Sequence, residues 1–194
     1  MKCRLGVDEQ DEYETLAGFV ETVAATGCDT FVVHARKAWL KGLSPKENRE
    51  VPPLRHEHVY RLKRERPQLR IVINGGIADV APALAHLAHV DGVMLGRAAY
   101  HDPYVLHRLD AALAGTALHS REALLRAWLP YVEAQCAHGV AVKHLTRHIL
   151  GLFHGQPGGR AFRQVLSEGA SRAGASVGLI EQALEAVARV PRAA

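Results

Sequence analysis

The sequence predicts an α/β fold in residues 1–114, built on a parallel sheet, followed by a small all-α helical bundle in residues 115–194. Three observations lead to this prediction. Short apolar runs alternate with helical patterns in the first region, as in βα units. From Ala117 onward no strand pattern follows. Hydrophobic residues make up 48% of the 194 residues, enough for a folded core.

Four short runs of apolar or β-branched residues are the expected strands. They do not alternate in polarity, which is typical of buried parallel strands. The runs are Lys2–Leu5, Thr30–His34, Ile71–Asn74 and Gly92–Leu95. Apolar residues at helical spacing predict helices between them, at Tyr13–Thr26, Arg55–Arg66 and Val80–Ala88.

Four βα units are half of a (β/α)8 barrel, which typically needs about 250 residues for all eight. The first region is therefore either a four-stranded open sheet or the second half of such a barrel. A long loop, Arg36–Leu54, interrupts the pattern without clear periodicity. Long ordered loops in compact domains tend to be functional.

The second region contains four helical patterns separated by Gly and Pro signals. They cover residues 120–138, 140–151, 160–173 and 176–190. We expect the junction between the two regions near Gly115.

Positive charge is concentrated in two segments of the chain. The formal net charge is +4, but residues 36–70 hold eleven Lys or Arg against four Glu. Residues 115–194 hold nine bases against five acids. A basic surface of this kind attracts polyanions, with nucleic acid as the leading candidate. The alternative is a solvated helix face.

Two of the expected strands end in glycine. Asn74-Gly75-Gly76 follows the third strand, and Gly96-Arg97 follows the fourth. Glycines let the backbone approach a ligand and direct N–H groups toward an anion. In phosphate-binding barrels the phosphate lies between the loops after strands 7 and 8. Together the two strand ends predict a phosphate site, with Arg97 adding a charge-assisted hydrogen bond. For either glycine motif alone, a tight turn is the favoured explanation.

Two further polar residues belong to the earlier strands. Lys2 opens the first strand, and His34 ends the second. Side chains at the carboxyl ends of strands point into a barrel mouth. The alternatives are a terminal lysine and a hydrogen-bonded histidine at the end of a strand.

The cysteines and the apolar runs indicate the cellular compartment. Cys3, Cys28 and Cys136 are odd in number and widely spaced, so no disulfide framework is expected. No apolar run of about 18 residues is present, and the first residues lack a secretory signal. We expect a cytoplasmic protein with no membrane partner.

The twelve histidines do not predict a metal site. His144 and His148 are four residues apart, and His86 and His89 are three apart. Neither pair has an HExxH context or a nearby third ligand. We therefore expect no bound metal.

Several motifs resemble the C-terminal part of bacterial tRNA-dihydrouridine synthases, most closely the A-type. The most specific is the block His34-Ala35-Arg36-Lys37-Ala38-Trp39-Leu40-Lys41-Gly42-Leu43-Ser44-Pro45-Lys46-Glu47-Asn48-Arg49-Glu50. The others are residues 2–8, Asn74-Gly75-Gly76-Ile77, residues 96–100 and residues 150–158. The resemblance covers nearly all 194 residues.

The resemblance implies a fold and a reaction. The fold is an FMN-binding (β/α)8 barrel followed by a helical tRNA-binding domain. The reaction is the reduction of D-loop uridine in tRNA to dihydrouridine by NADPH through FMN. The implied FMN-binding residues are Lys2, His34, Asn74, Gly75, Gly76, Gly96 and Arg97. The implied tRNA-binding residues are Lys46, Arg49, Arg160 and Arg163. We expect a monomer.

One family segment has no match in these residues. The family's catalytic cysteine lies within an Asn-x-Gly-Cys-Pro segment, and none of the three cysteines takes its place. The expectation is a truncated synthase, inactive by itself, with no catalytic residue of its own. A non-catalytic tRNA-binding remnant is the alternative. A third hypothesis, an unrelated phosphate-binding half barrel, is disfavoured by the specific block and the basic tail.

Overall fold

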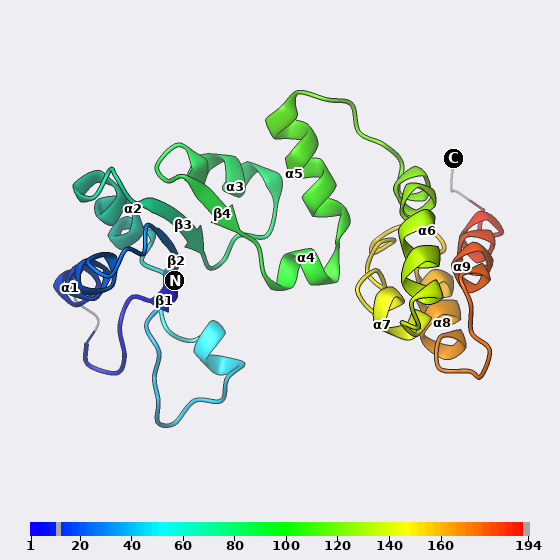
Figure 1. Ribbon diagram of the computed structural model, residues 1–194, viewed down its shortest axis with the longest axis horizontal. Coiled ribbons are helices and arrows are strands. Elements are labelled where there is room, and N and C mark those ends of the chain that lie inside the picture. The colour runs from blue at the N-terminus through cyan, green and yellow to red at the C-terminus, as the bar shows by residue number, and fades with distance from the viewer. Residues whose placement is uncertain (11–12, 192–194) are drawn as a thin grey trace. The chain divides into compact units, whose positions relative to one another are not determined.

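The computed structural model describes residues 1–10 and 13–191. The chain divides into two compact units, Met1–Gly96 and Arg97–Ala194 (Figure 1). The two compact units divide earlier in the chain than the expected boundary between residues 114 and 115. That expected boundary separates a half barrel from a helical domain, and it stays a prediction.

The first unit contains a parallel four-stranded sheet in the order β1-β2-β3-β4. The strands are β1 (Lys2–Arg4), β2 (Thr30–His34), β3 (Arg70–Asn74) and β4 (Gly92–Met94). The prediction of four parallel strands is confirmed, with bounds that differ by no more than one residue. The strands are adjacent in chain order because each crossover helix returns the chain beside the preceding strand.

One face of this sheet is buried and the other carries polar groups. Phe31 and Val33 of β2 and Ile71 and Ile73 of β3 are wholly buried. Full burial of such side chains contributes about 1.5–3 kcal/mol each. The alternate residues face the other way, and they include Lys2, Arg4, His34 and Asn74.

Three helices follow the first three strands: α1 (Tyr13–Ala24), α2 (His56–Glu65) and α3 (Val80–Leu87). Each buries one apolar stripe, and the buried apolar residues include Leu16, Val20, Val59, Leu62 and Ala83. α3 begins where the Asp79 carboxylate accepts a 2.7 Å hydrogen bond from the Val80 N–H. The three predicted helices are confirmed, each ending one or two residues early.

The described part of the second unit consists of helices and turns. These helices are α4 (Arg97–His101), α5 (Tyr104–Ala114), α6 (Arg121–Ala137), α7 (Val142–Thr146), α8 (Gly159–Gly169) and α9 (Gly178–Ala188). The side chains at the centre of its core are Leu125, Val132, Phe162, Leu166, Ile180 and Ala183. No described helix combines the length and the apolar character that a membrane span requires.

The helix predicted over residues 140–151 is wrong in its second half. α7 ends at Thr146, and turns follow. A Cβ on Gly151 would stand 2.0 Å from the backbone oxygen of His101. This part of the chain therefore lies directly on the backbone at the end of α4, a close approach that glycine permits.

Candidate functional site

The carboxyl edge of the sheet brings four residues into one row. The last residue of each strand is paired with the last residue of its neighbour: Arg4 with His34, His34 with Asn74, and Asn74 with Met94. The structure thus places the predicted residues His34 and Asn74 side by side. Lys2 pairs with Val32, so it lies on the same face but two residues back from the edge.

Arg4 belongs to this row and was not among the predicted site residues. Its guanidinium donates 2.9 Å hydrogen bonds from Nη1 to the backbone oxygens of Lys37 and Asn48. Period-two alternation along β1 puts Arg4 on the face that Lys2 occupies, which is the signal that could have identified it. Arg4 therefore ties the long loop to the edge of the sheet.

The Gly75-Gly76 turn at the end of β3 requires glycine at both positions. The φ angles are +117° at Gly75 and +74° at Gly76. A Cβ on Gly75 would stand 2.8 Å from His34 Cδ2, and a Cβ on Gly76 would stand 2.6 Å from Leu54 Cδ1. The turn, called the glycine cradle below, is backbone without side chains, and His34 and Leu54 already occupy the space that Cβ atoms would need.

His34 is a neutral imidazole among cations. Burial is the main cause that lowers the pKa of His34 to about 4, and the charges of Arg4, Lys2, Arg36 and Arg49 lower it further. A neutral imidazole offers one hydrogen-bond donor and one acceptor. The surrounding cations make this part of the edge suited to an anionic ligand.

Asn74 and Gly96 differ in how firmly the structure fixes them. The Asn74 amide nitrogen donates a 2.8 Å hydrogen bond to the Met94 oxygen, which sets the orientation of the amide. A Cβ on Gly96 would meet no atom within 4 Å. Packing within its unit therefore does not require glycine at position 96. Arg97 is the first residue of α4 and is exposed. The binding roles of Gly96 and Arg97 stay predictions.

The long loop, residues 36–54, is organised by side-chain hydrogen bonds. The Asn48 amide accepts from the Trp39 N–H at 2.8 Å and donates to the Trp39 oxygen at 2.7 Å. Ser44 and Glu47 form a reciprocal capping box, with hydrogen bonds of 2.7 and 3.3 Å. The capping box precedes a short 3₁₀ turn, η1 (Glu47–Arg49).

The four predicted RNA-binding residues are all exposed. Lys46 immediately precedes η1 and Arg49 is its last residue, and residues three apart project from the same side of such a turn. Arg160 and Arg163 lie in the first two turns of α8, again three apart on one side of a helix. Each unit therefore displays one basic pair.

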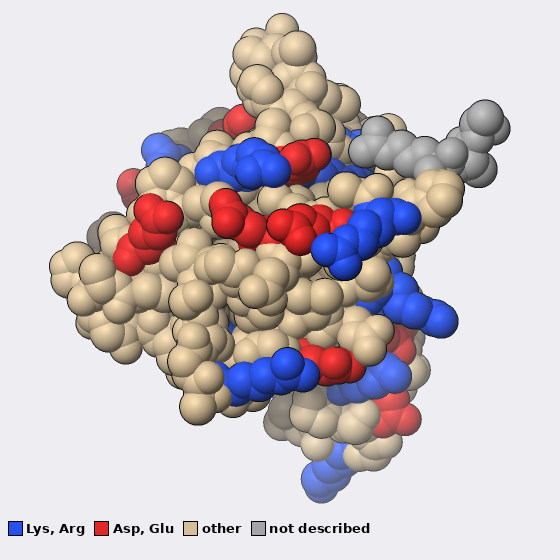
Figure 2. All heavy atoms as spheres, turned by 90° about the vertical axis from the view of Figure 1, so that its right-hand side faces the viewer, with Lys and Arg blue, Asp and Glu red and all other residues tan. Residues whose placement is uncertain are grey.

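Two exposed arginines of the second unit are paired with acids. Figure 2 shows Lys and Arg side by side with Asp and Glu on the face that it displays. On α6, Arg126 contacts Glu122 at 3.0 Å, and at the end of α9, Arg189 contacts Glu185 at 3.2 Å. Exposed pairs of this kind contribute little to stability, but they reduce the local positive potential.

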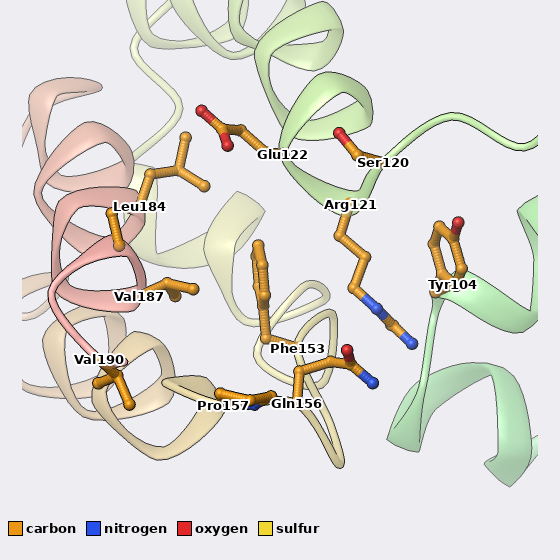
Figure 3. Close-up of a pocket in the computed structure, with 11 residues that line it drawn as sticks. Tyr104, Ser120, Arg121, Glu122, Phe153, Gln156, Pro157, Leu184, Val187 and Val190 are labelled. Atoms are coloured by element: carbon orange, nitrogen blue, oxygen red, sulfur yellow. The ribbon is translucent and has the colours of Figure 1, made fainter. Parts of the chain in front are cut away.

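A cavity of about 520 Å³ lies within the second unit. Figure 3 shows Arg121 extending toward Tyr104, with Phe153 between Arg121 and the α9 residues Leu184 and Val187. The Arg121 guanidinium is 4.0 Å from the Tyr104 ring centre and 2.9 Å from the Asp102 carboxylate. It is thus engaged in structural contacts, and sequence reasoning gave no indication of this cavity.

Comparison with known proteins identifies the family. A model of the dihydrouridine synthase family (Dus) matches residues 1–190. The tRNA-dihydrouridine(20/20a) synthase of Xanthomonas axonopodis pv. citri is 69% identical over 185 residues, which are 95% of this chain and 55% of that protein. The protein of the same name from Escherichia coli K12 is 50% identical over 191 residues, 97% of this chain and 55% of that protein.

A third relative shows the same coverage. The tRNA-dihydrouridine(20/20a) synthase of Xylella fastidiosa strain 9a5c is 58% identical over 188 residues, 96% of this chain and 55% of that protein. The chain thus spans about half the length of the curated relatives that it matches. The match over residues 1–190 and these identities confirm the resemblance that the motifs carry, and the chain belongs to the dihydrouridine synthase family.

Proposed function

We propose that this chain provides flavin-binding and tRNA-binding surfaces for the reduction of D-loop uridine in tRNA to 5,6-dihydrouridine. FMN would supply the hydride, with NADPH as the reductant. The observation that carries the proposal is the row Arg4, His34 and Asn74 beside a glycine cradle, in a chain of this family.

The cradle fits the phosphate group of FMN. Gly75 and Gly76 present backbone at positive φ and carry no side chain of their own, with His34 and Leu54 packed against the turn where Cβ atoms would stand. Asn74 ends the strand beside them, and the cations around His34 favour a dianionic ligand. By sequence position Gly96 and Arg97 would add backbone and a fixed positive charge to this group.

Lys2 would act on the flavin ring. It lies on the same face of the sheet as His34 and is exposed. A cation beside the ring favours the anionic reduced form of a flavin. His34 would contact the cofactor as a neutral imidazole and hold a proton at one ring nitrogen.

The RNA contact would be made by Lys46 and Arg49 in the first unit and by Arg160 and Arg163 in the second. The Ser44–Glu47 capping box holds the first pair in place without using either charge. Phosphate contacts by such bases are sequence-independent and weaken as salt rises.

These 194 residues contain no Asn-x-Gly-Cys-Pro segment. Expressed alone, they are therefore proposed to bind flavin and tRNA without completing the reduction.

Equilibrium binding tests the proposal. The purified 194-residue protein is titrated with FMN and with riboflavin, which lacks the phosphate, and separately with tRNA. We expect FMN to bind at least tenfold more tightly than riboflavin, and tRNA to bind with a strong salt dependence. Equal affinity for the two flavins would overturn the phosphate assignment, and salt-independent or absent tRNA binding would overturn the RNA surface.

A further inference from the structure

A histidine outside the predicted site is hydrogen-bonded to the glycine cradle. His56, the first residue of α2, places Nε2 3.0 Å from the backbone oxygen of Gly75. A carbonyl oxygen can only accept, so Nε2 carries the proton and donates it. The hydrogen bond joins the start of α2 to the end of β3.

The His56 ring packs against His86, which Tyr60 holds in turn. The two histidine rings meet at 75°, with the ring centres 4.6 Å apart. His86 is 8% exposed, and its Nδ1 lies 2.6 Å from the Tyr60 hydroxyl. Tyr60 comes from α2 and His86 from α3, so the cluster joins both helices beside the cradle.

The two residues before His56 also pack against the cradle or the strand end beside it. Leu54 methyl groups lie 2.9 Å and 2.6 Å from where Cβ atoms on Gly75 and Gly76 would stand. The Arg55 N–H donates a 2.9 Å hydrogen bond to the Ala35 oxygen, and the Ala35 N–H donates a 2.8 Å bond to the Asn74 oxygen. The segment 54–56 is therefore fixed against the end of β3.

We propose that His56 is a positioning residue for the phosphate monoester of the flavin, acting through the Gly75–Gly76 peptide. The inference rests on the proposed function. The Gly75 carbonyl and the Gly76 N–H belong to one planar peptide group. Donation to the carbonyl fixes the plane of that group and polarises it, which makes the Gly76 N–H a stronger donor.

Three variants separate the hydrogen bond from packing. His56→Phe keeps an aromatic edge against His86 and removes the donor. His56→Gln restores an N–H donor on a flexible side chain. His89→Phe is the matched control, because the His89 ring packs against the Tyr60 ring with the ring centres 4.4 Å apart, whereas the described hydrogen bond to the Gly75 oxygen comes from His56.

The first readout is the affinity of the full 194-residue chain for FMN and for riboflavin. We expect His56→Phe to weaken FMN binding about fivefold to tenfold, in line with one lost hydrogen bond, and to leave riboflavin binding unchanged. His56→Gln should recover most of the loss, and His89→Phe should match wild type. An equal loss for both flavins, or no recovery with glutamine, would overturn the proposal.

The second readout uses no flavin. The amide resonance of Gly76 in a ¹⁵N correlation spectrum should shift in His56→Phe and return toward wild type in His56→Gln. An unchanged Gly76 resonance would overturn the proposal. The Gly76 resonance could shift while the wild-type protein binds FMN and riboflavin with equal affinity. The assignment of the flavin phosphate to this turn would then be wrong, and the positioning of the Gly75–Gly76 peptide by His56 would be confirmed.

Discussion

The ring of His34 occupies the space that a side chain on Gly75 would need. A Cβ on Gly75 would stand 2.8 Å from His34 Cδ2, at a φ of +117°. The histidine on β2 and the glycine after β3 thus constrain each other, although they lie far apart in the sequence. The shape of the cradle depends on this contact.

Gly75→Ala should reduce the free energy of unfolding by about 1–3 kcal/mol, because it adds a clash to an unfavourable backbone conformation. Gly27→Ala is the matched control, since Gly27 also has positive φ, +94°, but no atom lies within 4 Å of its Cβ position. Urea denaturation measures both. Equal losses of unfolding free energy in the two variants would show that the His34 and Leu54 side chains move aside at no measurable cost.

Stability should depend on the protonation of His34. Its folded pKa, lowered to about 4, lies below its ordinary value of 6.5. As the pH falls, the unfolded chain therefore binds a proton at this histidine before the folded chain does. The free energy of unfolding should fall as the pH falls from about 6.5 to 4.

His34→Gln should flatten the pH dependence of stability in this range. Denaturation midpoints of wild type and variant at several pH values check the slope, and an NMR titration of the His34 ring checks the midpoint. Parallel slopes for the two proteins, or a ring that titrates near 6.5, would contradict this prediction.

Asn48→Ala should loosen the long loop without changing its charge. The variant loses both hydrogen bonds to Trp39, at 2.8 and 2.7 Å, with an expected cost of about 1–3 kcal/mol for the backbone groups left without this partner. Limited proteolysis should then cut within residues 36–54 earlier than in wild type. Because Lys46 and Arg49 depend on this loop, tRNA affinity should also fall. Unchanged proteolysis would indicate that the Arg4 contacts suffice.

Local patterns explain what could be predicted from the sequence. The short runs around Phe31 and Ile71 give strands because their β-branched and aromatic residues fill a buried face. The capping box at Ser44 and Glu47 has a recognisable spacing, S-x-x-E, and could have been found in the same way.

Long-range contacts explain what was missed. Alternation along β1 places Arg4 on the face of Lys2, but its position beside His34 comes from the strand register. His56 joins the site only through a contact with Gly75, nineteen residues away. The helix expected to reach residue 151 stops at Thr146, and the turn that follows lies against His101, a contact that no local pattern encodes.

tRNA binding should depend on the two basic pairs. Arg160→Ala with Arg163→Ala, or Lys46→Ala with Arg49→Ala, should weaken binding and reduce the salt slope by about one to two units, since each phosphate contact contributes roughly −0.7 to −0.9. Arg126→Ala with Arg189→Ala is the control, because these exposed arginines already contact Glu122 and Glu185. The same slope in all three double variants would place the RNA contact elsewhere.

The most direct measurement is the dihydrouridine content of tRNA made by a chimeric enzyme. This chain replaces the 191 matching residues of the Escherichia coli K12 relative, to which it is 50% identical, in a strain that lacks that protein. The tRNA is digested and analysed by mass spectrometry. We expect the chimera to restore the dihydrouridine that the strain lost, and the 194-residue chain alone to restore none. A folded chimera that restores no dihydrouridine, or restoration by the chain alone, would contradict the account.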